Sequence, residues 1–450
     1  MKAVLWSLYF QNSSSLLELR RKNSVLYLES NREVDEAEIP FFLPIFSPCT
    51  WPESAGPRVF YHGQPKKVEL PFLASNSLIL LPVSINGHPP VYFLLDTGVK
   101  ANLLFSKAMG DTLGLTYTRR LGMVGADGSS TVWAQISPVN SLDLGEVVGA
   151  LQSLLVLEED FLELESVIGI PVYGILGYEF FKHNAVKIDY EKSILTVYPP
   201  ESTVWRSPFY RRGALHVVDG KAYLDVKVKQ QAGPRLTGKV LVDTGANHGL
   251  LLNRETTSAI RLPEKQLETQ LGQSLGGVLY GVIGRVDALS IRGLTFSQVL
   301  TSFPEETPFS SRIKESGRMG SLGAEVLGRT TLILDYSRNE FFMKRNASFF
   351  HPFEFDMSGL VVKKMASPEK RLFVGDVREG SPAHLAGILP FDELISIDAV
   401  PILFWEMDQL VKLFRSEEGR EIQLELRRYP KPGASTFQEL SLRFRLTKQI

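Results

Sequence analysis

The chain has 450 residues, of which 44% are hydrophobic and 22% are charged, and its formal net charge is −1. This length predicts about three globular domains, and the balanced charge gives no basic surface that would favour nucleic acid as a partner. The single cysteine, Cys49, excludes an internal disulfide framework and a metal site built from several thiolates.

The first 65 residues have no predicted role. Four prolines between Ile39 and Pro52 exclude a helix interior and indicate an extended linker. The short apolar run at residues 3–10 is either an ordinary chain start or a weak export signal. The location is periplasmic or secreted under the second interpretation and cytoplasmic otherwise. No apolar run is long enough to predict a membrane-spanning helix.

Residues 66–350 consist of short apolar runs separated by turn residues, a pattern typical of β-structure. The run at 78–83 is followed by Asn86-Gly87, which indicates a hairpin because both residues tolerate positive φ. Residues 221–229 alternate apolar and charged side chains, as a half-buried strand does. We therefore predict a mainly β fold for this region.

The same region repeats itself. In each copy an apolar strand leads into Asp-Thr-Gly, and an apolar-apolar-Gly step follows, ending at Gly177 in the first copy and at Gly328 in the second. A glycine-containing hairpin candidate lies between these two features in each copy, and a strand pair closes each copy. Four features in the same order predict a duplicated β lobe, at residues 66–205 and 206–350. The distance from the later glycine to the next Ile/Leu-Asp-Tyr is shorter in the second copy, which predicts a shorter helix there.

Two Asp-Thr-Gly loops suit the hydrolysis of peptide bonds without a metal or other cofactor. The reaction needs a base for the attacking water and an acid for the substrate, and two adjacent carboxyls that share one proton provide both. The predicted catalytic pair is Asp96 and Asp243. The predicted supporting residues, which link the loops through hydroxyls and bring backbone N–H groups near the carboxylates, are Thr97, Gly98, Thr244 and Gly245.

These segments resemble the retropepsin-like aspartic proteases, in a fused single-chain form close to bacterial aspartyl proteases with a PDZ domain. The likeness rests on both Asp-Thr-Gly loops and on the steps at 175–177 and 326–328. It implies two lobes that share one cleft, a monomer, a polypeptide substrate, and a later glycine beside each catalytic loop. The implied flap tips are Gly125, Ala126, Asp127 and Gly128 in the first lobe and Gly276 and Gly277 in the second.

The residue after each Asp-Thr-Gly is Val99 or Ala246, where pepsin-like enzymes have a hydroxyl. Because no hydroxyl is available there to stabilise a carboxylate, we expect the pair to titrate higher than in a pepsin. The expected activity is weakly acidic to near neutral.

Residues 355–450 resemble the PDZ domains of bacterial proteases, through the stretches 381–387 and 392–398. This implies an α+β domain whose groove adds a peptide as a strand and holds its terminal carboxylate with backbone N–H groups. The predicted carboxylate loop is Ser358, Gly359 and Leu360. A module that only packs on the protease and binds nothing is the alternative.

Three other functions stay open. The first is a non-catalytic peptide-binding protein on the same fold. The second is a serine hydrolase using Ser274, whose G-x-S-x-G pattern requires a strand, a sharp turn and a helix. The third is a homodimer in which Asp96 pairs with its copy. The seven histidines lack metal-ligand spacing, and His248 is either a cleft residue or a plain loop residue.

Overall fold

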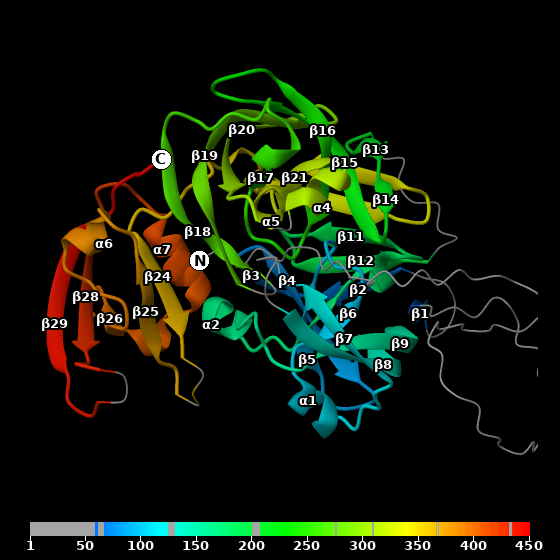
Figure 1. The fold of residues 1–450 in the computed structure, drawn as a ribbon, viewed down its shortest axis with the longest axis horizontal. Helices are drawn as coiled ribbons and strands as arrows, with labels where there is room; N and C mark the ends of the chain where they lie inside the picture. The colour runs from blue at the N-terminus through cyan, green and yellow to red at the C-terminus, as the bar shows by residue number, and fades with distance from the viewer. Residues whose placement is uncertain are drawn as a thin grey trace, which may run out of the picture.

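The computed structural model describes residues 59–61, 67–124, 131–199, 208–274, 277–307, 310–365, 367, 369–431 and 434–450. The fold is mainly β, as predicted, with two β lobes and a smaller C-terminal domain beside them (Figure 1). No helix in these ranges is both long and apolar enough to cross a membrane.

The first lobe is built on a nine-stranded sheet with the order β1-β9-β6-β10-β5-β4-β8-β7, and β3 pairs with β4. Its strands are β1 (Val59–Tyr61), β3 (Leu73–Ser75), β4 (Leu78–Ile85), β5 (Val91–Leu95), β6 (Asn102–Leu104), β7 (Arg119–Val124), β8 (Thr131–Asp143), β9 (Val147–Leu157) and β10 (Gly174–Leu176). Its helices are α1 (Lys107–Thr112), α2 (Leu164–Ile168) and α3 (Tyr178–Phe181). The predicted β4–β5 turn is confirmed, with positive φ at Asn86 and Gly87.

The second lobe repeats this plan in an eight-stranded sheet with the order β14-β15-β16-β21-β17-β20-β19-β18. Its strands are β14 (His216–Val218), β15 (Lys221–Lys229), β16 (Leu236–Asp243), β17 (Leu250–Leu252), β18 (Gln266–Ser274), β19 (Gly277–Ile291), β20 (Leu294–Pro304) and β21 (Arg318–Gly323). Its helices are η1 (Arg254–Thr256), α4 (Ser310–Glu315) and α5 (Ala324–Leu327). Strands β15, β16, β17 and β21 stand where β4, β5, β6 and β10 stand in the first lobe, which places the two Asp-Thr-Gly loops at matching ends.

A six-stranded sheet joins the two lobes, with the order β13-β23-β22-β11-β12-β2. Its strands are β2 (Val68–Pro71), β11 (Ala185–Asp189), β12 (Ile194–Tyr198), β13 (Arg211–Ala214), β22 (Thr330–Asp335) and β23 (Glu340–Arg345). Each lobe supplies three strands in mirrored order, and β11 pairs antiparallel with β22, with Ile188 opposite Leu332. An approximate twofold axis therefore passes between these two central strands.

The C-terminal domain has a sheet with the order β24-β25-β26-β28-β29, and β27 pairs with β26. Its strands are β24 (Leu360–Lys364), β25 (Leu372–Val377), β26 (Glu393–Ile397), β27 (Val400–Pro401), β28 (Glu421–Arg428) and β29 (Gln438–Arg445). Its helices are α6 (Pro382–Leu385), η3 (Ile402–Phe404) and α7 (Met407–Phe414), and η2 (Ala347–Phe350) precedes the domain. The domain has its own apolar core, and it lies against both lobes (Figure 1).

Candidate active site

Two buried strands deliver the Asp-Thr-Gly loops to the boundary between the lobes. Strand β5 ends in the buried residues Phe93, Leu94 and Leu95, and Asp96 follows directly. Strand β16 likewise ends at Asp243. The same apolar runs that predicted these strands bury the residues from which the two loops start. Each aspartate therefore follows directly after the core of its lobe.

The two threonines lock the loops together by reciprocal hydrogen bonds. The Thr97 N–H donates to Thr244 Oγ1, and the Thr244 N–H donates to Thr97 Oγ1, each over 3.1 Å. Each hydroxyl donates in turn to a carbonyl of the other lobe, from Thr97 to Val242 over 2.7 Å and from Thr244 to Leu95 over 2.8 Å. All four bonds are buried, so the relative position of the loops is fixed across the twofold axis.

The carboxyl groups of Asp96 and Asp243 approach the same glycine. A Cβ atom on Gly98 would lie 3.1 Å from Asp96 Oδ1 and 3.3 Å from Asp243 Oδ1. A Cβ on Gly245 would lie 2.3 Å from Asp96 Oδ2, so a side chain there would overlap the carboxylate. The Gly98 N–H donates to Asp96 Oδ1 over 2.6 Å. The glycines are thus needed for close approach to the carboxyl pair.

Burial and mutual repulsion favour a shared proton. Burial raises the pKa of Asp96 to about 7, against the Gly98 N–H and the charge of Lys221, which lower it. Burial and then the charge of Asp96 raise the pKa of Asp243 well above its usual value. Asp96 Oδ2 and Asp243 Oδ1 make no hydrogen bond among the described residues. A pair that keeps one proton toward neutral pH can act as base and acid together.

Lys221 is a charged neighbour that the sequence did not single out. It begins β15, and the β15–β16 register, with Tyr223 opposite Leu241, places it in line with Asp243. In the first lobe the corresponding place, in line with Asp96, is held by Leu78. Lys221 is buried, and burial lowers its pKa to about 7.

The later glycine of the second lobe is Gly323, which corrects the expectation for Gly328. In the first lobe Leu176 pairs in parallel with Leu95, and Gly177 follows; in the second, Gly323 pairs with Asp243 itself. A Cβ on Gly177 would lie 2.6 Å from Val99 O, and one on Gly323 would lie 2.2 Å from His248 O. Gly328 instead ends helix α5.

The same register removes the expected difference between the copies. Helices α3 and α5 each have four residues, so the second is not shorter. Val326-Leu327-Gly328 matches the apolar-apolar-Gly pattern but lies in and after helix α5. The step that lies beside the catalytic loop, residues 321–323, departs from the pattern because it contains the polar Ser321. That serine bonds to His248, with its Oγ 3.0 Å from His248 Nε2. His248 is buried, which places it under the loop rather than on an open cleft wall.

Hairpins stand where the flaps were predicted. Strands β7 and β8 form the first and β18 and β19 the second. The predicted tip residues 125–128 and 276 lie outside the described residues, and Gly277 pairs with Ser274 at the described end of the second hairpin. Ser274 is thus the last residue of a hairpin strand, which is not the strand-turn-helix context that a serine nucleophile of the G-x-S-x-G type needs.

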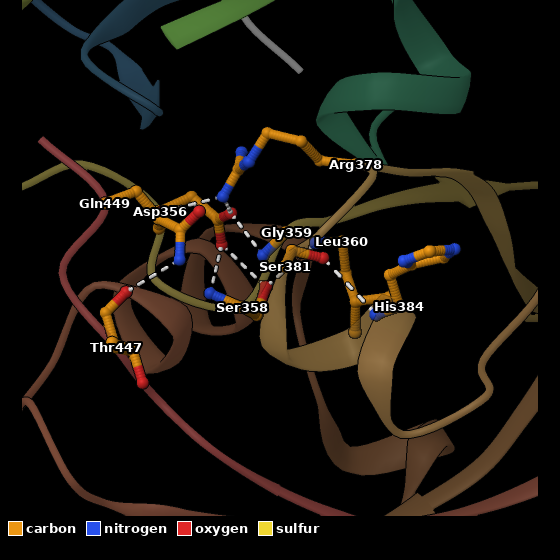
Figure 2. Close-up of polar contacts among 9 residues, drawn as sticks. All are labelled: Asp356, Ser358, Gly359, Leu360, Arg378, Ser381, His384, Thr447 and Gln449. Carbon is orange, nitrogen blue, oxygen red and sulfur yellow. Dashed lines mark hydrogen bonds and ion pairs between the residues drawn. The ribbon is translucent and has the colours of Figure 1, made fainter. Parts of the chain in front are cut away.

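The predicted carboxylate loop of the C-terminal domain runs into the first residue of β24 (Figure 2). The N–H groups of Ser358 and Gly359 donate to the Asp356 carboxylate, over 3.2 and 2.7 Å. The Leu360 N–H donates to Ser358 Oγ over 3.0 Å. Asp356, which the sequence analysis did not select, therefore accepts hydrogen bonds from two N–H groups of this loop. No group of three or more His, Cys, Asp or Glu in the described part of the chain could hold a metal ion.

Family models match both the lobes and the C-terminal domain. The aspartyl protease family model matches residues 81–180 and 225–326, and a PDZ domain model matches residues 373–428. A probable CtpA-like serine protease of Staphylococcus haemolyticus (strain JCSC1435) is 33% identical over 79 residues, which are 17% of this chain and 16% of that relative. Basic 7S globulin from soybean aligns with 62% of this chain and 95% of its own, at a TM-score of 0.36 and 10% identity. The chain thus carries two retropepsin-like aspartyl protease segments followed by a C-terminal PDZ domain.

Proposed function

We propose that the chain is an aspartic endopeptidase whose catalytic pair is Asp96 and Asp243. The observation that carries this proposal is the meeting of two buried carboxyls at Gly98, held by a reciprocal pair of threonines. A purely structural turn has no need to keep two acids in contact away from water, because burial of a carboxylate is unfavourable. The two acids are retained at that cost because they act on a substrate.

The pair performs hydrolysis with one proton. The ionised carboxyl takes a proton from water as the water oxygen attacks the carbonyl carbon, and the protonated carboxyl donates its proton to the carbonyl oxygen. In the second step one carboxyl protonates the amide nitrogen while the other removes a hydroxyl proton from the tetrahedral diol. The C–N bond then breaks, and the pair again holds one proton between Asp96 and Asp243.

One chain supplies both halves of this site. The six-stranded sheet joins the lobes through β11 and β22 of the same chain, so Asp96 meets Asp243 and not a second Asp96. We infer that the active unit is a monomer. Sedimentation of active material at the mass of two chains, with activity lost on dilution to one, would instead support the homodimer alternative.

Digestion of a randomised peptide library tests the activity. The wild-type chain is expected to cleave internal bonds, and a statine-type inhibitor, which imitates the tetrahedral diol, is expected to stop the cleavage. Asp243→Asn should abolish it, whereas Asp111→Asn, on the surface of α1, should not. Cleavage that persists in Asp243→Asn would refute the proposed pair. A wild-type chain that binds the inhibitor without cutting any library member would favour the non-catalytic peptide-binding alternative.

A further inference from the structure

The peptide groove of a PDZ domain lies between an edge strand and a helix. In this chain the edge strand is β24, which among the described residues pairs with β25 alone, and the helix is α7. A peptide ligand is added beside such an edge as a further strand, and its terminal carboxylate is held by the loop before the strand. An uncovered edge would also be a template for unwanted pairing.

A segment of the first lobe covers this groove. Helix α2 packs against both β24 and α7, and Figure 1 shows it between the first lobe and the C-terminal domain. Lys364, the last residue of β24, donates from Nζ to Glu165 Oε1 over 2.8 Å and to the carbonyl of Gly169 over 3.3 Å. One side chain of the groove thus holds both the first turn of α2 and the residue that ends it.

The turn after α2 fits closely against the start of α7. Gly169 has a φ of 82°, a left-handed conformation that glycine adopts without strain. A Cβ atom at this position would lie 2.6 Å from Met407 Cγ, in the first turn of α7. A second contact joins α7 to the first lobe: the Asn76 N–H donates to Asp408 Oδ1 over 3.2 Å.

At the other end of the groove, N–H groups of the predicted carboxylate loop are occupied within the chain. The N–H groups of Ser358 and Gly359 already donate to Asp356, and Arg378 Nη2 lies 3.3 Å from Asp356 Oδ2 (Figure 2). Two N–H groups of the loop are therefore already bonded to an internal carboxylate. An internal ligand of the groove needs no chain-terminal carboxylate, and α2, which lies within the chain, has none.

We propose that α2 and the turn at Gly169 are an internal ligand of the PDZ groove, which holds the first lobe while they are seated. A free peptide can enter the groove along β24 only by displacing α2. That displacement would reach the active site, because α2 leads into β10, whose Leu176 carbonyl accepts the Asp96 N–H over 2.9 Å. The PDZ domain and the catalytic loop thus share one short segment of chain.

Hydrogen exchange with a charge swap tests the inference in the full chain. Glu165→Lys and Lys364→Glu each turn the ion pair into a like-charge pair, and each is expected to speed amide exchange in residues 163–169 about fivefold. The double variant Glu165→Lys/Lys364→Glu restores the ion pair with its signs reversed but not the bond from residue 364 to the Gly169 carbonyl, so it is expected to exchange more slowly than either single variant. The readout is independent of proteolysis, so it is informative whether or not the chain cleaves peptides.

The matched control is Lys363→Glu, the same charge change one residue earlier on β24. Neighbouring residues of a strand point to opposite faces, and the Lys363 side chain lies over Gly375 of β25. This control should leave exchange in 163–169 unchanged. Equal exchange in both single variants and the wild type would overturn the inference. A double variant that exchanges as fast as the single variants would also overturn it, because the faster exchange would then not come from the loss of this ion pair.

Discussion

The threonine pair offers the sharpest test of how the two lobes are held. Thr97→Val removes a buried hydroxyl and keeps the shape of the side chain. The hydroxyl donates to Val242 O over 2.7 Å and accepts the Thr244 N–H over 3.1 Å, so the change leaves one buried acceptor and one buried donor without partners. Each such group costs about 1–3 kcal/mol, which predicts a loss of about 2–6 kcal/mol in the free energy of unfolding.

Urea unfolding followed by intrinsic fluorescence measures this loss, with Thr97→Ser as the control. Serine keeps the hydroxyl and lacks one methyl group, so its expected loss is about 1 kcal/mol. Activity should follow, because a carboxyl displaced by about 1 Å costs about a hundredfold in rate. If Thr97→Val were as stable as Thr97→Ser, the reciprocal hydrogen bonds would not be what fixes the loops.

Further predictions concern the charge and packing around the pair. Because burial raises the pKa of Asp96 to about 7, kcat/KM should fall as the pH rises through neutrality and the shared proton is lost; a profile that peaks well below pH 4 would contradict this. The positive charge of Lys221 lowers the pKa of Asp96, so Lys221→Met should move the alkaline limb to higher pH, while Lys221→Arg, whose charge does not titrate near neutrality, should not move it upward. A carboxyl whose pKa is raised on folding destabilises the fold as pH rises above about 4, so Asp243→Asn should raise the melting temperature more at pH 8 than at pH 4. Gly323→Ala places a methyl 2.2 Å from His248 O and should lower the melting temperature by several degrees, as differential scanning calorimetry would show.

The Asp-Thr-Gly loops and the strands before them could be predicted because residues adjacent in sequence determine their conformation. An apolar run followed by Asp-Thr-Gly specifies a buried strand that ends in a tight loop, and its duplication indicates that two such loops belong together. The turn at Asn86-Gly87 follows from backbone preference alone. In each of these cases neighbouring residues decide the conformation.

The later glycine could not be chosen by local pattern, because two candidate steps lie within five residues of each other in the second copy. Pairing with β16 decides between them, and pairing is a long-range property. A usable signal was the spacing to the following Asp, which is 12 residues from Gly177 to Asp189 and also 12 from Gly323 to Asp335. The docking of α2 in the PDZ groove has no local signature at all, since it joins residues 165 and 364 through tertiary contacts.

Because the two half-sites are fused in one chain, they can differ in sequence. A peptide substrate has two distinct ends, so such differences can act on one end of it and not on the other. A homodimer must present the same groups to both. Here Lys221 stands in the second lobe where Leu78 stands in the first, so one side of the carboxyl pair carries a titratable amine and the other an apolar side chain. The first lobe contributes α2, which packs against β24 and α7 of the C-terminal domain. The charge of Lys221 and the packing of α2 on the C-terminal domain are independent of each other, because Lys221→Met changes no contact of α2 described above. The two asymmetries can therefore be separated by mutation, with the pH profile reporting the first and hydrogen exchange reporting the second.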